Sequence, residues 1–305
     1  MAFKNIELNH QKILELIDEN AEVEQILTGC EFTEGPIWSP KEKCLYFSDM
    51  PGDKRRRWSE ADGVSIVKDP SNKCNGMTYD ADGNLYVCEH VTSTLVKETP
   101  DGERVTIASH WDGKELNSPN DVVLRNDGVI YFSDPWYGRM PVFGEERERE
   151  LGFQGLYRIT ADGELHLEAD DFEQTNGLCF SPDEKLLYVN DSPRGHIRVF
   201  DVSADGSLSN SRMFADDIGD GELDSGIVDG MKTDEKGNIY VTGPRGMWVF
   251  DAEGHHLGII KMPEHAGNLN WGGDNWDVLY CCCATSVYRV QLKVRGNHSS
   301  YMDMK

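Results

Sequence analysis

The distribution of hydrophobic residues divides the chain near residue 28. Before this point, apolar positions follow one face of a short amphipathic helix, and a second apolar group has the composition of a strand. The helical positions are Leu8, Ile13, Leu14, Leu16 and Ile17, and the strand positions are Val23, Ile26 and Leu27. We therefore expect residues 1–27 to form a short helical segment that also supplies a closing strand.

After residue 28 the pattern changes to short β-type segments separated by turn dipeptides. Asp-Gly occurs nine times, and this dipeptide tolerates the positive φ angles of tight hairpins. Tight turns between β-rich segments indicate antiparallel meanders. The sequence therefore predicts an all-β protein over most of its length.

The β-type segments repeat six times. In each repeat a Tyr follows an acidic or amide residue by eleven or twelve positions. The pairs are Glu34 and Tyr46, Asn75 and Tyr86, Asn120 and Tyr131, Asn176 and Tyr188, Asp229 and Tyr240, and Asn268 and Tyr280. The text around each pair repeats as well, as in EGPIWSPKEKCLYFSD, NDVVLRNDGVIYFSD and NGLCFSPDEKLLYVND.

The spacing of the repeats matches the blades of a β-propeller. The intervals between the six polar positions are 41, 45, 56, 53 and 39 residues, and a four-stranded blade needs about 40–50. The two longer intervals contain insertions at residues 138–153 and 216–229. We predict a six-bladed propeller over residues 28–295, followed by a polar tail, 296–305, that frays. A long β-solenoid is disfavoured because its repeats are shorter and more uniform.

Six equivalent polar residues in a propeller form a ring at the mouth of the central channel. Local turn capping is an alternative explanation for the amides, above all for Asn75 and Asn268, but it explains Glu34 poorly. Carboxylate and amide oxygens select a hard cation, and Ca²⁺ accepts such ligands in flexible geometry. We therefore expect one divalent cation, first Ca²⁺, with Zn²⁺, Mn²⁺ or Mg²⁺ as alternatives.

Several further residues are candidates for the pocket around this ring. Asp229 is a second carboxylate that can act as a base, and Asp121 and Asp134 lie close to the third ring position in sequence. Trp136 and Tyr137 follow in SDPWYG, and aromatic faces of this kind pack well against sugar rings. Turn capping and blade packing remain the alternative roles for these residues.

Composition limits the partners. The 305-residue chain has a net charge of −24, which argues against nucleic acid and against an anionic membrane surface. No apolar segment approaches the ~20 residues of a membrane helix, and the N-terminus has no apolar signal core. The eight Cys show no zinc spacing, so we expect buried, reduced thiols in a cytoplasmic protein.

The order of the motifs resembles a known family. EGPIW, NSPNDVVLRNDGVIYFSDPWYG, TNGLCFSPDEKLLYVND and DGMKTDEKGNIYVTG are similar to the gluconolactonase, senescence marker protein (regucalcin) and luciferin-regenerating enzyme family, especially to bacterial gluconolactonases. The resemblance implies metal ligands at Glu34, Asn176 and Asp229, a metal or substrate contact at Asn120, and Asp229 as general base. Ser118 stands where animal members place an Arg, so their sugar contacts cannot be transferred.

Together these observations predict a metal-dependent lactonase. Its substrate is a small neutral sugar lactone, contacted by Asn75, Asn120, Asp121, Asp134, Trp136 and Tyr137. A phosphotriesterase resembling diisopropyl-fluorophosphatase is the alternative enzyme, because it uses the same kind of oxygen-ligand site. A propeller that binds calcium without catalysis is the alternative outside the enzymes.

Overall fold

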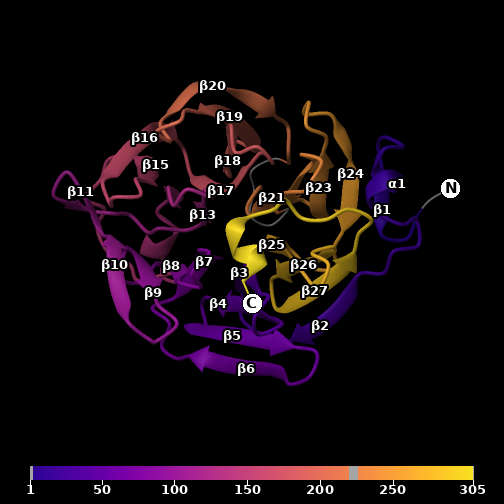
Figure 1. Cartoon of the computed structure of the whole chain (residues 1–305), viewed down its shortest axis with the longest axis horizontal. Coiled ribbons are helices and arrows are strands. Elements are labelled where there is room, and N and C mark those ends of the chain that lie inside the picture. The colour runs from indigo at the N-terminus through magenta and orange to yellow at the C-terminus, as the bar shows by residue number, and fades with distance from the viewer. Residues whose placement is uncertain (1–2, 220–225, 305) are drawn as a thin grey trace.

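A computed structural model describes residues 3–219 and 226–304 (Figure 1). Six antiparallel sheets surround a central channel. Helical structure in the described residues is limited to α1 (Ile13–Leu16) and the 3-10 turns η1 (Tyr137–Arg139) and η3 (Ser300–Asp303). The prediction of an all-β, six-bladed propeller with a short N-terminal helical segment is confirmed.

Each blade contains four consecutive antiparallel strands, except that the sixth borrows one strand from the N-terminus. Blade one contains β3 (Thr33–Ser39), β4 (Cys44–Asp49), β5 (Lys54–Ser59) and β6 (Gly63–Lys68). Blade two contains β7 (Cys74–Tyr79), β8 (Leu85–Glu89), β9 (Thr94–Glu98) and β10 (Arg104–Ala108). Blade three contains β13 (Val122–Leu124), β14 (Ile130–Asp134), β15 (Gln154–Ile159) and β16 (Leu165–Phe172). Blade four contains β17 (Thr175–Phe180), β18 (Leu186–Asp191), β19 (His196–Val202) and β20 (Leu208–Ala215). Blade five contains β21 (Met231–Thr233), β22 (Ile239–Gly243), β23 (Gly246–Phe250) and β24 (His256–Lys261). Blade six contains β25 (Ala266–Gly272), β26 (Val278–Cys283) and β27 (Ser286–Gln291). A two-stranded hairpin, β11 (His110–Trp111) and β12 (Lys114–Glu115), lies between blades two and three.

The N-terminal segment completes the sixth blade and extends the fifth. β2 (Glu24–Thr28) pairs with β27 in the sixth blade, with Gln25 opposite Tyr288. β1 (Ile6–Leu8) adds a fifth strand to the fifth blade by pairing with β24. Pairing an N-terminal strand with the last blade joins the two ends of the chain and removes an exposed sheet edge from the ring.

The repeated Tyr residues lie on the second strand of each blade and fill the space between blades. Tyr280 stacks on Trp38 of the first blade, with ring centroids 5.4 Å apart. Tyr131 meets Phe180 of the next blade edge to face at 5.4 Å. Aromatic pairs of this kind stabilise a core beyond their buried area, so the Tyr repeat records blade-to-blade packing.

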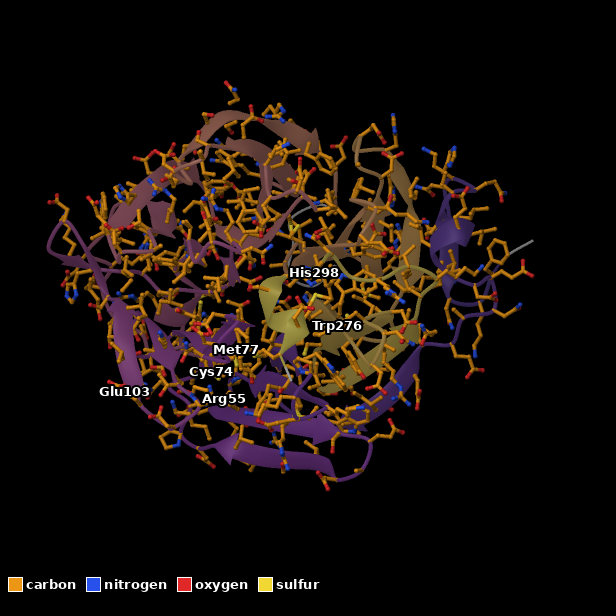
Figure 2. The ribbon with its side chains drawn as sticks, in the orientation of Figure 1. Arg55, Cys74, Met77, Glu103, Trp276 and His298 are labelled. Atoms are coloured by element: carbon orange, nitrogen blue, oxygen red, sulfur yellow. The ribbon has the colours of Figure 1, made fainter. Side chains whose placement is uncertain are left out.

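The prediction that the C-terminal tail frays is wrong for residues 296–304. This segment crosses one mouth of the channel, near the centre of the ring in Figures 1 and 2. Tyr301 is only 6% exposed, and its ring lies 5.6 Å from that of Trp276 and 6.2 Å from that of Tyr79. One aromatic anchor therefore orders a tail whose composition is otherwise polar.

Two predictions from composition can be compared with the described residues. All eight cysteines are buried and free, as expected for a chain without a disulfide framework. Within residues 3–219 and 226–304, no helix has the length and apolar character needed to cross a bilayer.

Candidate functional site

The ring residues lie at the second or third residue of the innermost strands, or two positions before them in the third and fifth blades. A register irregularity begins at the ring residue in blade one, contains it in blades two and four, and precedes it in blade six. Irregularities of this type redirect a side chain out of the normal alternation of a strand. The backbone therefore turns these polar side chains toward the channel axis.

Glycine follows the ring residue in four blades because neighbouring blades approach each other closely there. A Cβ on Gly35 would lie 2.0 Å from the carbonyl oxygen of Asn75, and one on Gly177 would lie 2.1 Å from that of Asp229. A Cβ on Gly76 would likewise lie 2.6 Å from the carbonyl oxygen of Asn120, and one on Gly230 would lie 2.0 Å from the side-chain oxygen of Asn268. The motifs EGP, NGM, NGL and DGM thus record the close packing that brings the ring together.

The ring residues form the floor of a cavity of about 380 Å³. Five of the six predicted ring residues line it, whereas Asn268 lies behind Glu34 and donates a hydrogen bond to its Oε2 over 2.9 Å. The lining residues are Phe32, Glu34, Met50, Asn75, His90, Asn120, Tyr137, Phe143, Asn176, Ile227, Asp229 and His265. The polar floor and the largely apolar walls therefore come from different segments.

A chain of hydrogen bonds connects the amides of the floor. Asn75 Nδ2 donates to Asn120 Oδ1 over 2.8 Å, and Asn120 Nδ2 donates to Asn176 Oδ1 over 2.6 Å. Asn176 Nδ2 then donates to Ser192 Oγ over 3.0 Å, and Ser192 Oγ donates to the carbonyl of Val228. The fourth blade thereby fixes both Asn176 and the backbone next to Asp229.

Glu34 and Asp229 place two carboxyl groups in this buried floor. Burial raises the pKa of Glu34 to about 7. Burial and the negative charge of Glu34 raise the pKa of Asp229 well above its usual value. Two buried carboxylates repel each other unless a proton or a cation lies between them.

This donor set fits a divalent cation. Glu34 and Asp229 supply two negative charges, Asn120 and Asn176 supply amide oxygens, and the floor offers neither thiolate nor imidazole from these four positions. Oxygen ligands of this kind suit Ca²⁺ better than Zn²⁺. Asn75 Oδ1 is a further buried oxygen without a hydrogen-bond partner in the described part of the chain.

Asp121 occupies the position that glycine holds in four other blades, and it lies beneath the cavity floor. It is 3% exposed, and its Oδ2 is 4.0 Å from Lys232 Nζ. Its Oδ1 accepts the backbone N–H of Val122 over 2.9 Å. Asp121 does not line the cavity. It therefore contributes a negative charge beside Lys232 and does not contact a ligand bound in the cavity.

Asp134 also lies outside the cavity, and two other blades explain its role. Its carboxylate accepts the backbone N–H groups of Asn117 and Ser118, over 2.9 and 2.8 Å. Asp49 and Asp191 end the equivalent strands and accept backbone N–H groups from the equivalent segments, 17 or 18 residues earlier. The repetition indicates that Asp134 holds a loop in position.

The first insertion, residues 138–153, and Tyr137 directly before it supply part of the cavity wall. Tyr137 and Phe143 line the cavity, whereas Trp136 lines a neighbouring hollow of about 250 Å³. Lys73 Nζ binds carbonyl oxygens on this insertion, at 2.9 Å from Val142 O and 3.2 Å from Gly144 O. Of the aromatic pair predicted from SDPWYG, Tyr137 therefore lines both spaces and Trp136 lines the hollow.

His90 is a cavity residue that the sequence patterns did not identify. It is fully buried, its Nδ1 lies 2.9 Å from the carbonyl of Phe143, and its Nε2 lies 3.1 Å from Asn120 Oδ1. Burial lowers the pKa of His90 to about 4, so the ring is neutral near neutral pH. His90 connects the insertion to the ring. The residues VCE align with FSD at the ends of other second strands, so His90 takes the position that Met50 and Pro135 hold in the first and third blades, and a His at this position was the available signal.

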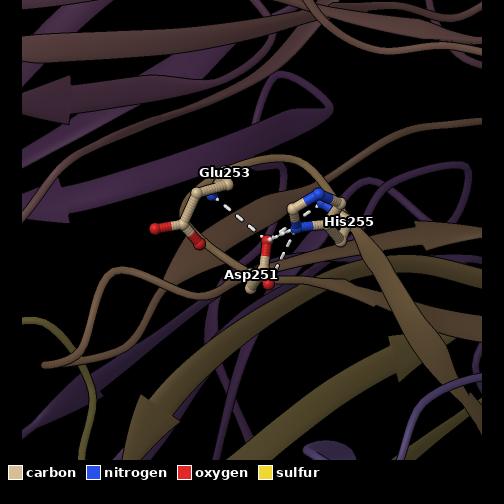
Figure 3. A group of neighbouring side chains, drawn as sticks. All are labelled: Asp251, Glu253 and His255. Carbon is tan, nitrogen blue, oxygen red and sulfur yellow. Dashed lines mark hydrogen bonds and ion pairs between the residues drawn. The ribbon is translucent and has the colours of Figure 1, made fainter.

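A second group of possible metal-binding side chains lies on the outer part of the fifth blade (Figure 3). Ligand atoms of Asp251, Glu253 and His255 lie within 4.8 Å of one another. Asp251 Oδ1 already accepts the backbone N–H groups of Glu253 and His255, and its Oδ2 lies 3.2 Å from Lys12 Nζ. The cluster is therefore a turn capped by Asp251, whose carboxylate already pairs with the ammonium group of Lys12.

Comparison with known proteins agrees with this architecture. The family model described as "SMP-30/Gluconolactonase/LRE-like region" matches residues 32–285. A gluconolactonase of Zymomonas mobilis is 31% identical over 300 residues, which cover 92% of this chain and 84% of that protein. A pentonolactonase of Haloferax volcanii is 25% identical over 264 residues, covering 84% of this chain and 83% of that protein.

Solved structures show the same likeness. A gluconolactonase from Xanthomonas campestris superposes with a TM-score of 0.86 at 30% identity, covering 95% of both chains. A calcium-binding regucalcin from Agrobacterium tumefaciens superposes with a TM-score of 0.75 at 16% identity, covering 90% of this chain and 95% of that chain. The second likeness concerns the fold alone. The family match confirms the resemblance predicted from the order of the motifs.

Proposed function

We propose that this chain, which belongs to the SMP-30/Gluconolactonase/LRE-like family, is a lactonase that opens a small neutral sugar lactone to its aldonic acid. Glu34, Asn120, Asn176 and Asp229 would hold one divalent cation, with Ca²⁺ the first choice. Asp229 would also act as the general base. The relatives named gluconolactonase and pentonolactonase support the class of substrate.

The observation that carries this proposal is the pair of buried carboxyl groups on the cavity floor. Glu34 and Asp229 are 2% and 8% exposed, and both lie among amides that face the same space. A purely structural pair would be costly to keep, because each buried charge loses its hydration. A site that binds a cation and activates water gives both groups a chemical role.

Asp229 is suited to accept a proton from water. In the absence of a cation, burial and the charge of Glu34 raise the pKa of Asp229, and a bound cation would offset part of this rise and keep the carboxylate ionised, as a general base requires. Its backbone carbonyl accepts a hydrogen bond from Asn190, and the preceding carbonyl accepts one from Ser192. These contacts fix the backbone that carries the carboxylate, and general-base catalysis requires a well-positioned group.

The reaction is a hydrolysis that consumes one water. Water attacks the lactone carbonyl carbon while Asp229 takes its proton, and the ring C–O bond then breaks as the leaving oxygen regains a proton. A bound cation would supply polarisation of the carbonyl and stabilisation of the oxyanion. Asn75 and Tyr137 face the same space and can orient the substrate.

The two alternative functions are less well supported. A phosphotriesterase would use a similar set of oxygen ligands, but the relatives above are named for lactones. A calcium-binding propeller without catalysis would give no role to a cavity beside Asp229.

Metal replacement tests this proposal. Chelator-stripped protein should hydrolyse δ-gluconolactone slowly, and added Ca²⁺, Mn²⁺, Zn²⁺ or Mg²⁺ should restore acid release to different extents. Full turnover by protein that elemental analysis shows to be metal-free would contradict the role of the cation. Absence of turnover with every metal, in protein that still binds Ca²⁺, would favour the phosphotriesterase and then the binding role.

A further inference from the structure

The walls of the cavity differ in chemistry from its floor. Above the ring, the space is bounded by Phe32, Met50, Tyr137, Phe143, Ile227 and His265. Phe32 meets Phe143 edge to face at 5.7 Å and lies 6.0 Å from the ring of His265. Burial lowers the pKa of His265, so this ring too is neutral near neutral pH.

A second hollow adjoins this apolar wall. It has a volume of about 250 Å³ and shares Tyr137 and Ile227 with the main cavity. Its other lining residues are Trp136, Met140, Gln174, Ser192 and Pro193. Among the described residues, no lysine or arginine lines either space.

These walls are poorly matched to a ligand that carries hydroxyl groups on every side. A hydroxyl pressed against Phe or Met loses its hydration without gaining a hydrogen bond, which costs binding free energy. A hydrocarbon group in the same place gains free energy as its surface leaves water. The polar floor can serve the lactone group, while the walls and the hollow serve an apolar substituent.

We propose that the site also hydrolyses lactones whose ring carries an alkyl or aryl substituent, and that the hollow beside Trp136 receives this substituent. This proposal rests on the proposed lactonase function. The bond changes are the same: water adds to the carbonyl carbon, the ring C–O bond breaks, and a substituted hydroxy acid is released. The wall residues would then set specificity, while the ring residues carry the chemistry.

A matched pair of substrates tests the inference. δ-Valerolactone has no substituent, and δ-decalactone is the same ring with a pentyl chain. With Ca²⁺-loaded protein, kcat/KM for δ-decalactone should be higher by at least about tenfold, a value typical of burying a few methylenes in an apolar pocket. δ-Gluconolactone is measured beside them to monitor the proposed function.

A matched pair of variants locates the subsite. Met140→Glu places a charge in the wall of the hollow and should reduce the ratio of the two kcat/KM values toward one. Met213→Glu makes the same change at a residue that is 52% exposed on β20, and should leave the ratio unaltered. Thermal unfolding of both variants identifies any loss of folding.

The outcomes separate the two proposals. Hydrolysis of δ-gluconolactone and δ-valerolactone without any preference for δ-decalactone would overturn the apolar subsite and leave the lactonase intact. A preference that survives Met140→Glu would overturn the assignment to this hollow. Failure on all three lactones would overturn the proposed function and the inference together.

Discussion

Gly177 lies directly against the backbone of Asp229: a Cβ at residue 177 would be 2.1 Å from the Asp229 carbonyl oxygen. Gly177 belongs to the fourth blade and Asp229 leads into the fifth, so the contact limits how closely Asp229 can approach the fourth blade. Position 177 requires glycine because a Cβ would not fit there. Backbone conformation is not the reason, since the φ angle of Gly177 is not positive.

Gly177→Ala should therefore displace Asp229 and lower turnover. Displacement by about 1 Å typically costs up to a hundredfold in rate, so we expect a loss of about tenfold to hundredfold. Gly152→Ala is the matched control, because a Cβ there meets nothing within 4 Å. Equal activity of the two variants on δ-gluconolactone, with both folded, would show that this contact does not position the base.

His90 should act as a positioning residue through Asn120 and Phe143. His90→Ala removes both contacts, and a loss of about 0.5–1.5 kcal/mol for each of the two hydrogen bonds predicts a decrease in kcat/KM of about fivefold to 150-fold. His90→Gln should recover part of this loss, because an amide can donate and accept at a similar reach. Retention of full kcat/KM by His90→Ala would remove the proposed connection; the exposed His110→Ala serves as control.

Removal of the cation should make stability depend more strongly on pH. In the folded protein without a cation, burial raises the pKa of Glu34 from 4.5 to about 7 and raises that of Asp229 as well. The folded state then binds more protons than the unfolded chain. This stabilisation is complete below about pH 4.5 and is lost as the pH rises through about 7.

The measurement is the Tm of chelator-treated and Ca²⁺-loaded protein at about pH 5.5 and pH 8. Ca²⁺ should raise Tm more at pH 8, because it replaces protons that the two carboxylates otherwise need. Glu34→Gln/Asp229→Asn is the control and should lose the difference. An equal Tm gain at both pH values in the unmutated protein would argue against these two ligands.

Tyr301 should stabilise the fold without serving the reaction. Tyr301→Ala removes a ring that packs between Trp276 and Tyr79, and we expect a loss of about 2–3 kcal/mol in the free energy of unfolding. Turnover at low temperature should stay near the original value, because Tyr301 does not line the catalytic cavity. An unchanged urea midpoint would show that the tail contributes nothing to stability.

The repeat predicted the fold well because propeller geometry imposes the same packing six times. Tyr131 and Tyr280 are constrained by aromatic residues of neighbouring blades, so the pattern survives in the sequence. The ring residues Glu34 and Asn176 are constrained in the same way by the glycines beside them. A feature that every blade must satisfy is visible from one chain.

Features present in a single blade were harder to predict. His90 joins the floor to an insertion from another blade, and its contact with Phe143 connects residues 53 positions apart. Asp134 lies close to Asn120 in sequence, yet its carboxylate is used by backbone N–H groups. The tail depends on one buried ring, Tyr301, which composition does not reveal.

The most direct test of the central proposal is the turnover of Asp229→Asn on δ-gluconolactone in the presence of Ca²⁺, with bound metal measured on the same sample. The substitution keeps the shape and an oxygen ligand but removes the base. We predict a folded, Ca²⁺-binding protein whose kcat is lower by about a hundredfold to ten-thousandfold. Original kcat in this variant would contradict the assignment of Asp229 as general base.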